Sequence, residues 1–465
     1  MESSAPNYLP ITEEVAAIIR DAVGEKAVIR DAEKMEPFGK DATERCRMPE
    51  LVVEAECPEQ VQALLRLANR HRFPVTPRGT GTGLAGGAVP VEGGVVLSLA
   101  AMNRILSIDP DNLVAVVEPG VINADLKQAA REKGLYYPPD PASYDTCTLG
   151  GNAATNAGGP SCVKYGTTRD YVLGLDAVLA SGELIRAGVQ TRKGVVGYDL
   201  ARLLVGSEGT LGVITRLMLK LIPAPPAVTT LVALFPDLPA AMRSVSATLA
   251  RGHVPCALEF LDRHCLELVG DLLPFEGVAE AGAFLLVELD GPPALIDREI
   301  EDVGEICMEC DAVDALLAPD SYKRARMWEV RKEVSLRVER DSPLYIPEDV
   351  AVPIARIADL VSGLPEFETR YGMKIYSFGH AGDGNIHLNI TAESPEAGER
   401  VEEGINALLK EVVSMGGTIS GEHGIGLTKK RFLSLELSPA SIRLQRGIKR
   451  LFDPNLILNP GKIFE

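Results

Sequence analysis

A run of glycines at residues 77–87, PRGTGTGLAGG, restricts the fold of the first half of the chain more than any other feature. The spacing Gly81-x-Gly83-x-x-Gly86 matches the dinucleotide-binding pattern, but a loop of that kind opens directly into a helix. Here AVPVEGGVVLSL follows, with a proline, two more glycines and a further predicted strand. We therefore expect the backbone N–H groups of this run, beside Arg78, to wrap an anionic pyrophosphate without a helix dipole. A mobile surface loop is the alternative for this run taken alone.

Two more glycine-rich stretches lie in the same predicted domain, at residues 149–159 (LGGNAATNAGG) and 206–212 (GSEGTLG). The first of them is preceded by the proline-rich residues 138–143 (PPDPAS). Dense glycine and proline are typical of loops rather than of helices or strands. We expect the three loops to line one elongated ligand.

The chain is predicted to divide at residues 223–226, where three prolines in four residues fit a linker better than the interior of a helix or strand. Before the linker, alternating strand and helix patterns predict an α/β domain over residues 1–222. Beyond it, the order strand, helix, strand occurs twice, which predicts a ferredoxin-like domain over residues 227–418. This second domain is mostly apolar and is expected to be a lid rather than the chemical centre. Residues 419–465 are too few for a domain and are expected to pack back on the first one.

Charge and cysteine content argue against several classes of protein. The net charge of -18, from 47 basic and 65 acidic residues, is opposite to what nucleic acid or an anionic membrane surface attracts. No apolar run approaches the roughly 20 residues that span a bilayer, and the start lacks a signal-peptide pattern, so a cytoplasmic location is expected. The eight cysteines are too sparse for a disulfide framework or an iron–sulfur cluster and are expected to be thiols.

Three of the six histidines fall in two short glycine-rich segments, SFGHAGDGNIHLNI and SGEHGIG. On a straight strand His380 and His387 would point to opposite faces, so the turn at residues 382–384 must bend the chain if they share a ligand. Two histidines and a carboxylate make a candidate three-ligand site for Zn, Mn or Fe. Glu422 suits that metal, whereas His423 points elsewhere in extended chain and suits a general base that removes a hydroxyl proton. The alternatives are a metal-free pair of histidines and ordinary structural histidines.

Taken together, these stretches resemble the flavoproteins of the vanillyl-alcohol oxidase type, in the branch of D-lactate dehydrogenase, D-2-hydroxyglutarate dehydrogenase and the GlcD component of glycolate oxidase. The resemblance runs from about residue 51 to the C-terminus and rests on the order of PRGTGTGLAGG, PPDPASYDTCTLGGNAATNAGG, KYGTTRDYVLG, GYDLARLLVGSEGTLGVIT, GHAGDGNIHLNI, SGEHGIG and NPGKIF. It implies an α+β chain: a two-subdomain PCMH-type FAD-binding domain, a ferredoxin-like α/β cap domain and a short C-terminal helical return.

The resemblance also implies that the first domain binds FAD. Some relatives attach the flavin through a histidine in the first loop, but Thr82 stands at that place, so non-covalent FAD is expected. The positions that match cofactor-binding residues of the family are Pro77, Arg78, Gly79, Thr80, Gly81, Thr82, Gly83, Pro139, Asp140, Ser143, Gly150, Gly151, Asn152, Thr155, Asn156, Gly158, Gly159, Glu208, Gly209, Gly212, Val213, Ile214 and Asn459.

In the second half of the chain, the resemblance implies roles for six side chains. It matches Arg331 and Asn389 to substrate-binding residues, although an arginine on a helix is most often solvated. Glu348 and Asp349 stand where the 2-hydroxyglutarate branch tends to carry a lysine, which favours a monocarboxylate substrate. The family's metal ligands match His380, His387 and Glu422, and its catalytic base matches His423.

The expected function is FAD-dependent oxidation of a small D-2-hydroxy acid, such as D-lactate or glycolate, to the 2-oxo acid. Reduced FAD must then pass electrons outside the chain, and relatives use electron-transfer flavoprotein, a quinone or a separate iron–sulfur subunit. The alternatives are a D-2-hydroxyglutarate dehydrogenase, a flavin-carrying electron-transfer subunit without its own substrate, and a metallohydrolase with merely structural glycine loops. Nucleic-acid binding has no basic footprint in this sequence.

Overall fold

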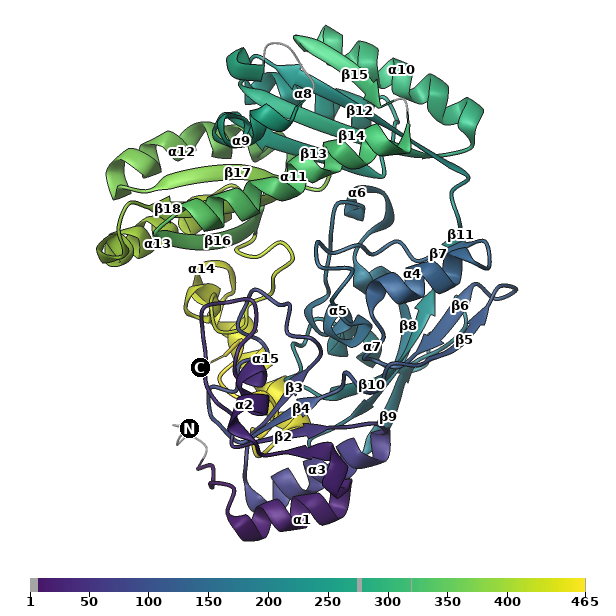
Figure 1. Ribbon diagram of the computed structural model, residues 1–465, viewed down its shortest axis with the longest axis vertical. Coiled ribbons are helices and arrows are strands. Elements are labelled where there is room, and N and C mark those ends of the chain that lie inside the picture. The colour runs from purple at the N-terminus through teal and green to yellow at the C-terminus, as the bar shows by residue number, and fades with distance from the viewer. Residues whose placement is uncertain (1–6, 274–277, 319, 465) are drawn as a thin grey trace. The chain divides into compact units, whose positions relative to one another are not determined.

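The computed structural model describes residues 7–273, 278–318 and 320–464, and it divides the chain into two compact units (Figure 1). Unit 1 contains the described parts of Met1–Gly158, Thr167–Ala224 and His423–Glu465. Unit 2 contains Gly159–Gly166 and the described part of Pro225–Glu422. Helices and antiparallel sheets dominate both units, which confirms the α+β class. The eight residues Gly159–Gly166 join unit 2 although they lie within the sequence of the predicted first domain.

The first sheet of unit 1 has the strand order β1-β2-β4-β3, with β2, β4 and β3 parallel. Its strands are β1 (Val28–Ile29), β2 (Leu51–Glu54), β3 (Val75–Arg78) and β4 (Val95–Ser98). Helices α1 (Glu13–Val23) and α3 (Pro58–His71) bury apolar side chains in the core of this sheet. Pro58 occupies the first turn of α3, where its missing N–H leaves no bond unmade, as the sequence predicted.

The second sheet of unit 1 is antiparallel, in the order β5-β6-β10-β8-β9. Its strands are β5 (Ile105–Asp109), β6 (Val114–Val117), β8 (Val172–Val178), β9 (Leu184–Gly188) and β10 (Val213–Lys220). Strands β8 and β9 form the hairpin predicted to turn at Ser181 and Gly182. Helix α4 (Asn123–Arg131) follows β6, also as predicted.

The second glycine-rich stretch is not a loop throughout, which corrects the prediction. Residues Leu149–Thr155 form helix α5, and the Thr148 hydroxyl caps it by accepting a hydrogen bond from the Gly151 N–H at 3.2 Å. Asn156, with φ of 56°, ends the helix in the left-handed conformation. The cap at one end and the left-handed residue at the other allow one short helix despite two glycines.

The C-terminal segment belongs to unit 1. It begins its helical part with α15 (Pro439–Phe452) and then runs beside β3. The Val75 N–H donates to the Ile457 carbonyl at 2.8 Å, and the Asn459 N–H donates to the Val75 carbonyl at 2.8 Å. These bonds place Asn459 next to the strand that leads into the first glycine loop.

Unit 2 is built on one seven-stranded antiparallel sheet, in the order β15-β12-β14-β13-β17-β18-β16. Its first four strands have the ferredoxin-like order, which confirms that prediction, and three further strands extend the sheet. The strands are β12 (Ala227–Phe235), β13 (Ala257–Asp262), β14 (Ala283–Gly291), β15 (Asp314–Ala318), β16 (Leu344–Ala351), β17 (Lys374–His380) and β18 (Asn385–Ala392).

Helices cover both faces of this sheet (Figure 1). One face carries α8 (Leu238–Ala250), α10 (Pro293–Glu309), α12 (Ile357–Tyr371) and α13 (Gly398–Ser414). The other face packs against α9 (Arg263–Val269) and α11 (Ser321–Asp341), with Met327, Val330 and Val334 of α11 in its core.

Two expectations from composition can be checked in the described residues. All eight cysteines are free thiols, as predicted. No described helix combines the length and the apolar character needed to cross a bilayer.

Candidate functional site

His380 and His387 lie on the two strands of one hairpin, β17–β18. Phe378 pairs directly with His387, and His380 lies two residues beyond Phe378, so both histidines point to the same face of the sheet. Gly384 makes the turn possible: its φ is +88°, and a Cβ there would lie 2.0 Å from the Val352 carbonyl oxygen. The predicted bend is confirmed, because the Nε2 atoms of the two histidines are 3.4 Å apart.

Glu422 joins the two histidines, as predicted. Its Oε1 lies 3.7 Å from His380 Nε2 and 3.5 Å from His387 Nε2, so the three atoms form a nearly equilateral triangle. The three side chains are between 5% and 17% exposed. Two imidazole nitrogens and one carboxylate oxygen within this spacing form a group that could hold a metal ion. In a tetrahedral site with bonds of about 2.1 Å, neighbouring ligand atoms are about 3.4 Å apart, so the spacing fits.

Behind this triangle lies Glu259, a fully buried carboxylate that the sequence reasoning missed. Its Oε1 accepts from His380 Nδ1 at 2.5 Å, and its Oε2 accepts from Arg331 Nε at 2.7 Å. The bond on Nδ1 orients the imidazole of His380 so that its Nε2 faces Glu422. The only signal in the sequence is one carboxylate in the otherwise apolar strand residues 257–261, ALEFL. The expected absence of convergent polar groups in the second domain is therefore wrong.

The buried carboxylates and imidazole perturb one another. Burial lowers the pKa of His380, but the carboxylates of Glu259 and Glu422 raise it well above its ordinary value overall. Burial raises the pKa of Glu259, but His380 and Arg331 lower it overall. Burial also raises the pKa of Asp383, in the hairpin turn, to about 6. In the absence of a metal, His380 and Glu259 therefore form an ion pair.

Arg331 and Asn389 lie on the same face of the sheet as the histidines. The Arg331 guanidinium stacks 4.4 Å over the Phe378 ring, and its Nη1 and Nη2 have no hydrogen-bond partner within the described residues. Asn389 is two residues beyond His387 on β18, and its Nδ2 donates to Ser335 Oγ at 3.3 Å. Ser335 and Arg331 are four residues apart on α11 and so share one face of that helix. The structure thus brings both predicted substrate-binding residues toward the histidine hairpin.

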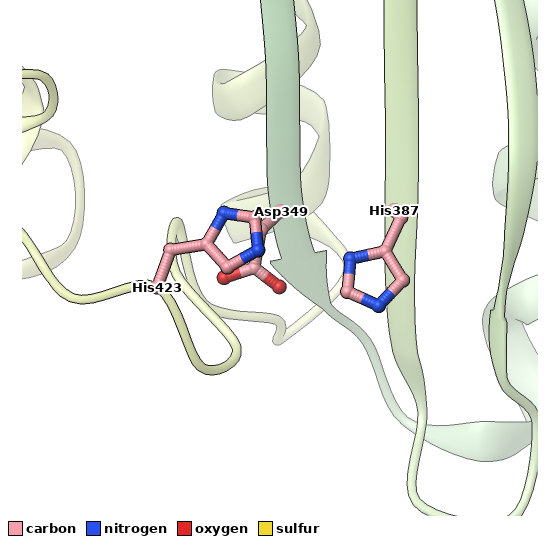
Figure 2. Close-up of side chains that lie close together, drawn as sticks. All are labelled: Asp349, His387 and His423. Carbon is pink, nitrogen blue, oxygen red and sulfur yellow. The ribbon is translucent and has the colours of Figure 1, made fainter. Parts of the chain in front are cut away.

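Asp349 fixes the loop that carries Glu422, a second role that the sequence reasoning missed. It pairs directly with His387 across strands β16 and β18, and both side chains are drawn in Figure 2. The Asp349 Oδ2 accepts the backbone N–H groups of Gly421 at 2.9 Å and Glu422 at 2.8 Å. Its Oδ1 accepts from Asn385 Nδ2 at 2.6 Å, and the side chain is fully buried. The charge of Asp349 therefore serves the backbone of this loop.

His423 directly follows Glu422, so their Cα atoms are about 3.8 Å apart across one peptide bond. On its other side, the Glu208 carboxylate accepts the N–H groups of Ile425 and Gly426, both at 2.8 Å. Burial raises the pKa of Glu208, and these two backbone bonds offset only part of that shift. The predicted base thus sits between two dipeptides, residues 421–422 and 425–426, that are each held by a buried carboxylate.

The first glycine loop is held together by Arg78. This guanidinium donates to the carbonyl oxygens of Lys40 at 2.5 Å, Pro37 at 3.1 Å and Thr80 at 3.4 Å. Gly81 has φ of +79°, and a Cβ there would lie 2.1 Å from Arg78 Nη2, so only glycine allows this packing. Arg78 therefore shapes the loop, and the backbone N–H groups of the loop remain the candidate anion donors.

The other predicted cofactor residues lie around this loop in unit 1, except Gly159, which is the first residue of its segment in unit 2. Asn459 Nδ2 donates to the carbonyl oxygens of Gly87 at 2.9 Å and Glu208 at 2.7 Å, which joins the first and third glycine loops. Asn459 Oδ1 and Asn152 Nδ2 are buried and have no hydrogen-bond partner among the described residues. An unmet acceptor and an unmet donor beside glycine loops fit the polar edge of a flavin.

The remaining predicted cofactor positions are distributed over three elements. Gly150, Gly151, Asn152 and Thr155 are in helix α5, with Asn156 and Gly158 just beyond it. Pro139, Asp140 and Ser143 precede α5, and Glu208, Gly209 and Gly212 connect α7 (Leu200–Leu204) to β10, where Val213 and Ile214 lie.

The ion pair between His380 and Glu259 predicts a pH dependence of stability. Because the pKa of His380 is raised in the folded chain, its contribution is fully present below the unfolded value of about 6.5 and is lost as the pH rises through the raised pKa. We expect the melting temperature of the metal-free protein to fall more between pH 6 and 9 than that of His380→Gln, by calorimetry. His71→Gln, outside the cluster, should follow the unmodified protein. Parallel curves for the protein and His380→Gln would contradict the ion pair.

The anchoring role of Asp349 predicts local loosening in Asp349→Ala. Losing three hydrogen bonds to a buried carboxylate should lower the opening free energy of residues 420–423 by about 2–4 kcal/mol. Hydrogen exchange measured by mass spectrometry should then be faster in this segment, while the exposed Asp359→Ala on α12 leaves it unchanged. Unaltered exchange in Asp349→Ala would show that other contacts hold the loop.

Sequence comparisons identify both halves of the chain. A family model described as "FAD binding domain" matches residues 49–188, and one described as "FAD linked oxidases, C-terminal domain" matches residues 224–463. The chain is 42% identical over 430 residues to glycolate oxidase subunit GlcD of Bacillus subtilis, covering 92% of each chain. It is 39% identical over 471 residues to D-lactate dehydrogenase of Anaerostipes hadrus, covering 98% of each.

Solved structures show the same fold at low sequence identity. The p-cresol methylhydroxylase structure superposes with a TM-score of 0.78 at 19% identity and covers 98% of each chain. A 4-ethylphenol oxidase from Gulosibacter chungangensis gives a TM-score of 0.75 at 19% identity over 99% of each chain. With matching family models over both units and relatives near 40% identity over nearly the whole length, the chain belongs to the FAD-linked oxidases with a PCMH-type FAD-binding domain, as its motifs predicted.

Proposed function

We propose that this flavoprotein oxidises a small D-2-hydroxy acid, such as D-lactate or glycolate, to the corresponding 2-oxo acid. The observation that carries this proposal is the triangle of His380, His387 and Glu422 ligand atoms, 3.4 to 3.7 Å apart, in a chain with an FAD-binding domain. The names of the relatives, glycolate oxidase subunit and D-lactate dehydrogenase, support the same substrate class.

We assign a divalent metal to this triangle, with Zn, Mn or Fe as the candidates. Imidazole and carboxylate ligands suit all three ions. The metal, when bound, supplies a positive charge that lowers the pKa of a substrate hydroxyl. Glu259 behind His380 completes the carboxylate–histidine arrangement that commonly orients a metal ligand.

Arg331 is the proposed partner of the substrate carboxylate. Its Nε is engaged by Glu259, whereas Nη1 and Nη2 present a pair of donors that matches the two oxygens of a carboxylate. Asn389, nearby on β18, offers an amide to the same substrate. The neighbouring charges are mostly acidic, from Glu259, Asp349 and Asp383. A second carboxylate, as in 2-hydroxyglutarate, would meet repulsion here, which favours a monocarboxylate.

His423 is the proposed general base. Its imidazole would accept the hydroxyl proton of the substrate, and the anchored dipeptides on either side hold its backbone in place. FAD, when bound, supplies the acceptor for the hydride that leaves the carbon bearing that hydroxyl. The base therefore needs to hold one proton while the substrate becomes a 2-oxo acid.

Electrons must then leave the flavin for an acceptor outside the chain. Electron-transfer flavoprotein, a quinone and a separate iron–sulfur subunit are the candidates. A flavin-carrying subunit without its own substrate is a weaker proposal, because such a subunit has no need for the converging ligand triangle.

Substrate-dependent bleaching of the flavin tests the base. With saturating D-lactate under anaerobic conditions, His423→Ala should reduce its flavin about 10²- to 10⁴-fold more slowly than the unmodified protein, by stopped-flow absorbance. The FAD content should be unchanged, and L-lactate should be inactive with both proteins. Reduction at a near-normal rate would remove His423 from this role, and the lack of bleaching by any D-2-hydroxy acid would overturn the proposed substrate class.

Metal content tests the triangle independently of turnover. The purified protein should contain about one divalent metal per chain by mass spectrometry, and His387→Ala should bind it at least 10-fold more weakly. His264→Ala, a partly buried histidine outside the triangle, is the matched control and should retain the metal. Equal metal content in all three proteins would place any bound ion elsewhere.

A further inference from the structure

Strand β15 is an edge of the seven-stranded sheet in unit 2. It pairs with β12 on one side, and no strand of the described chain pairs with its other side. An open groove of about 820 Å³ lies between β15 and helix α10. Its lining includes the apolar side chains of Leu231, Met308 and Leu317, and the acidic side chains of Glu301 and Glu305. Neither the FAD-binding loops nor the histidine cluster uses this groove.

The groove exposes apolar surface beside unpaired backbone. Leu317 pairs with Leu231, so both point to the α10 face of the sheet, and Leu317 remains 48% exposed. Met308 on α10 is 53% exposed. Leu316, on the opposite face of the same strand, is 37% exposed. Natural edge strands usually carry a lysine, a bulge or an inward charge that prevents pairing, but β15 (DALLA) has a charge only at its first residue.

A row of acidic side chains accompanies the groove along α10. Asp297, Glu301, Glu305 and Glu309 recur every four residues and so lie along one side of the helix. Glu309 is paired with Arg251, but Glu301 and Glu305 form no ion pair with any described residue. Like charges four residues apart cost a helix about 0.2–0.5 kcal/mol per pair, so helix stability does not account for the row.

We propose that this groove binds an extended segment of another protein, which adds to β15 as an eighth strand. Its backbone would bond to the open edge of β15, its apolar side chains would cover Leu317 and Met308, and its lysines or arginines would pair with Glu301 and Glu305. The charge selects a basic partner over a second copy of this chain. A two-fold β15 pairing would bring each acidic row toward its own copy, between two chains of net charge -18. This surface is independent of the proposed oxidation.

A pair of synthetic peptides tests the required chemistry on the FAD-loaded protein. A fluorescein-labelled decapeptide of alternating lysine and valine should bind saturably by fluorescence anisotropy, and about 0.5 M NaCl should weaken it at least 10-fold. The same decapeptide with glutamate in place of lysine should not bind. Absence of saturable binding by the lysine peptide, or equal binding of both peptides, would overturn the proposal.

Surface variants locate the binding. Glu301→Lys with Glu305→Lys should weaken the lysine peptide at least 10-fold, and Leu317→Ser should weaken it at least 3-fold. The matched control is Glu399→Lys with Glu403→Lys on α13, which has the same four-residue spacing, exposure and charge change and should leave binding intact. An equal loss in the control pair would mean attraction to the overall charge and would overturn the assignment.

Light scattering after size exclusion distinguishes the other occupant. The protein and Leu317→Ser should have the same mass in solution. If the protein is instead a dimer that Leu317→Ser converts to a monomer, the groove is an interface between two copies of this chain and the proposal is wrong.

Discussion

The arrangement of unit 2 depends on one buried carboxylate, Glu259, which is shared between an imidazole and a guanidinium. Both partners come from elements far away in sequence, His380 on β17 and Arg331 on α11, and both bonds are 2.7 Å or shorter. Removing one partner of such a buried group commonly costs about 3–5 kcal/mol, because the remaining charge is left without compensation. The same carboxylate thus sets the imidazole that faces Glu422 and the guanidinium proposed to hold a substrate, so the two parts of the site are built as one.

Local sequence patterns predicted the elements that local forces decide. The β8–β9 hairpin, the helix that Pro58 opens and the bend between His380 and His387 all follow from turn residues and apolar periodicity within a short stretch. Helix α5 was missed because dense glycine is typical of loops, while the Thr148 cap that starts the helix depends on one hydroxyl. Here one capping bond decided against the composition of the whole segment.

The supporting carboxylates could not be predicted in the same way. Glu259 is 121 residues away from His380, and their contact depends on the antiparallel pairing of β13 with β17, which no local pattern specifies. Asp349 is 73 residues away from the Glu422 backbone that it holds. The sequence suggested only a substrate preference for Asp349, because a carboxylate that accepts backbone N–H groups leaves no motif. Family resemblance identified the residues proposed to act on substrate, and the structure supplied the residues that orient them.

The β17–β18 turn also limits how this region can change in length. Side chains alternate along a strand, so inserting or deleting one residue in the turn would shift the pairing of Phe378 with His387 and turn one histidine toward the α12 face of the sheet. A two-residue change would keep the face but displace the imidazole by about 6–7 Å, far outside the reach of a shared ligand. Substitutions can therefore accumulate around this hairpin during evolution, whereas insertions and deletions would separate the two histidines at once.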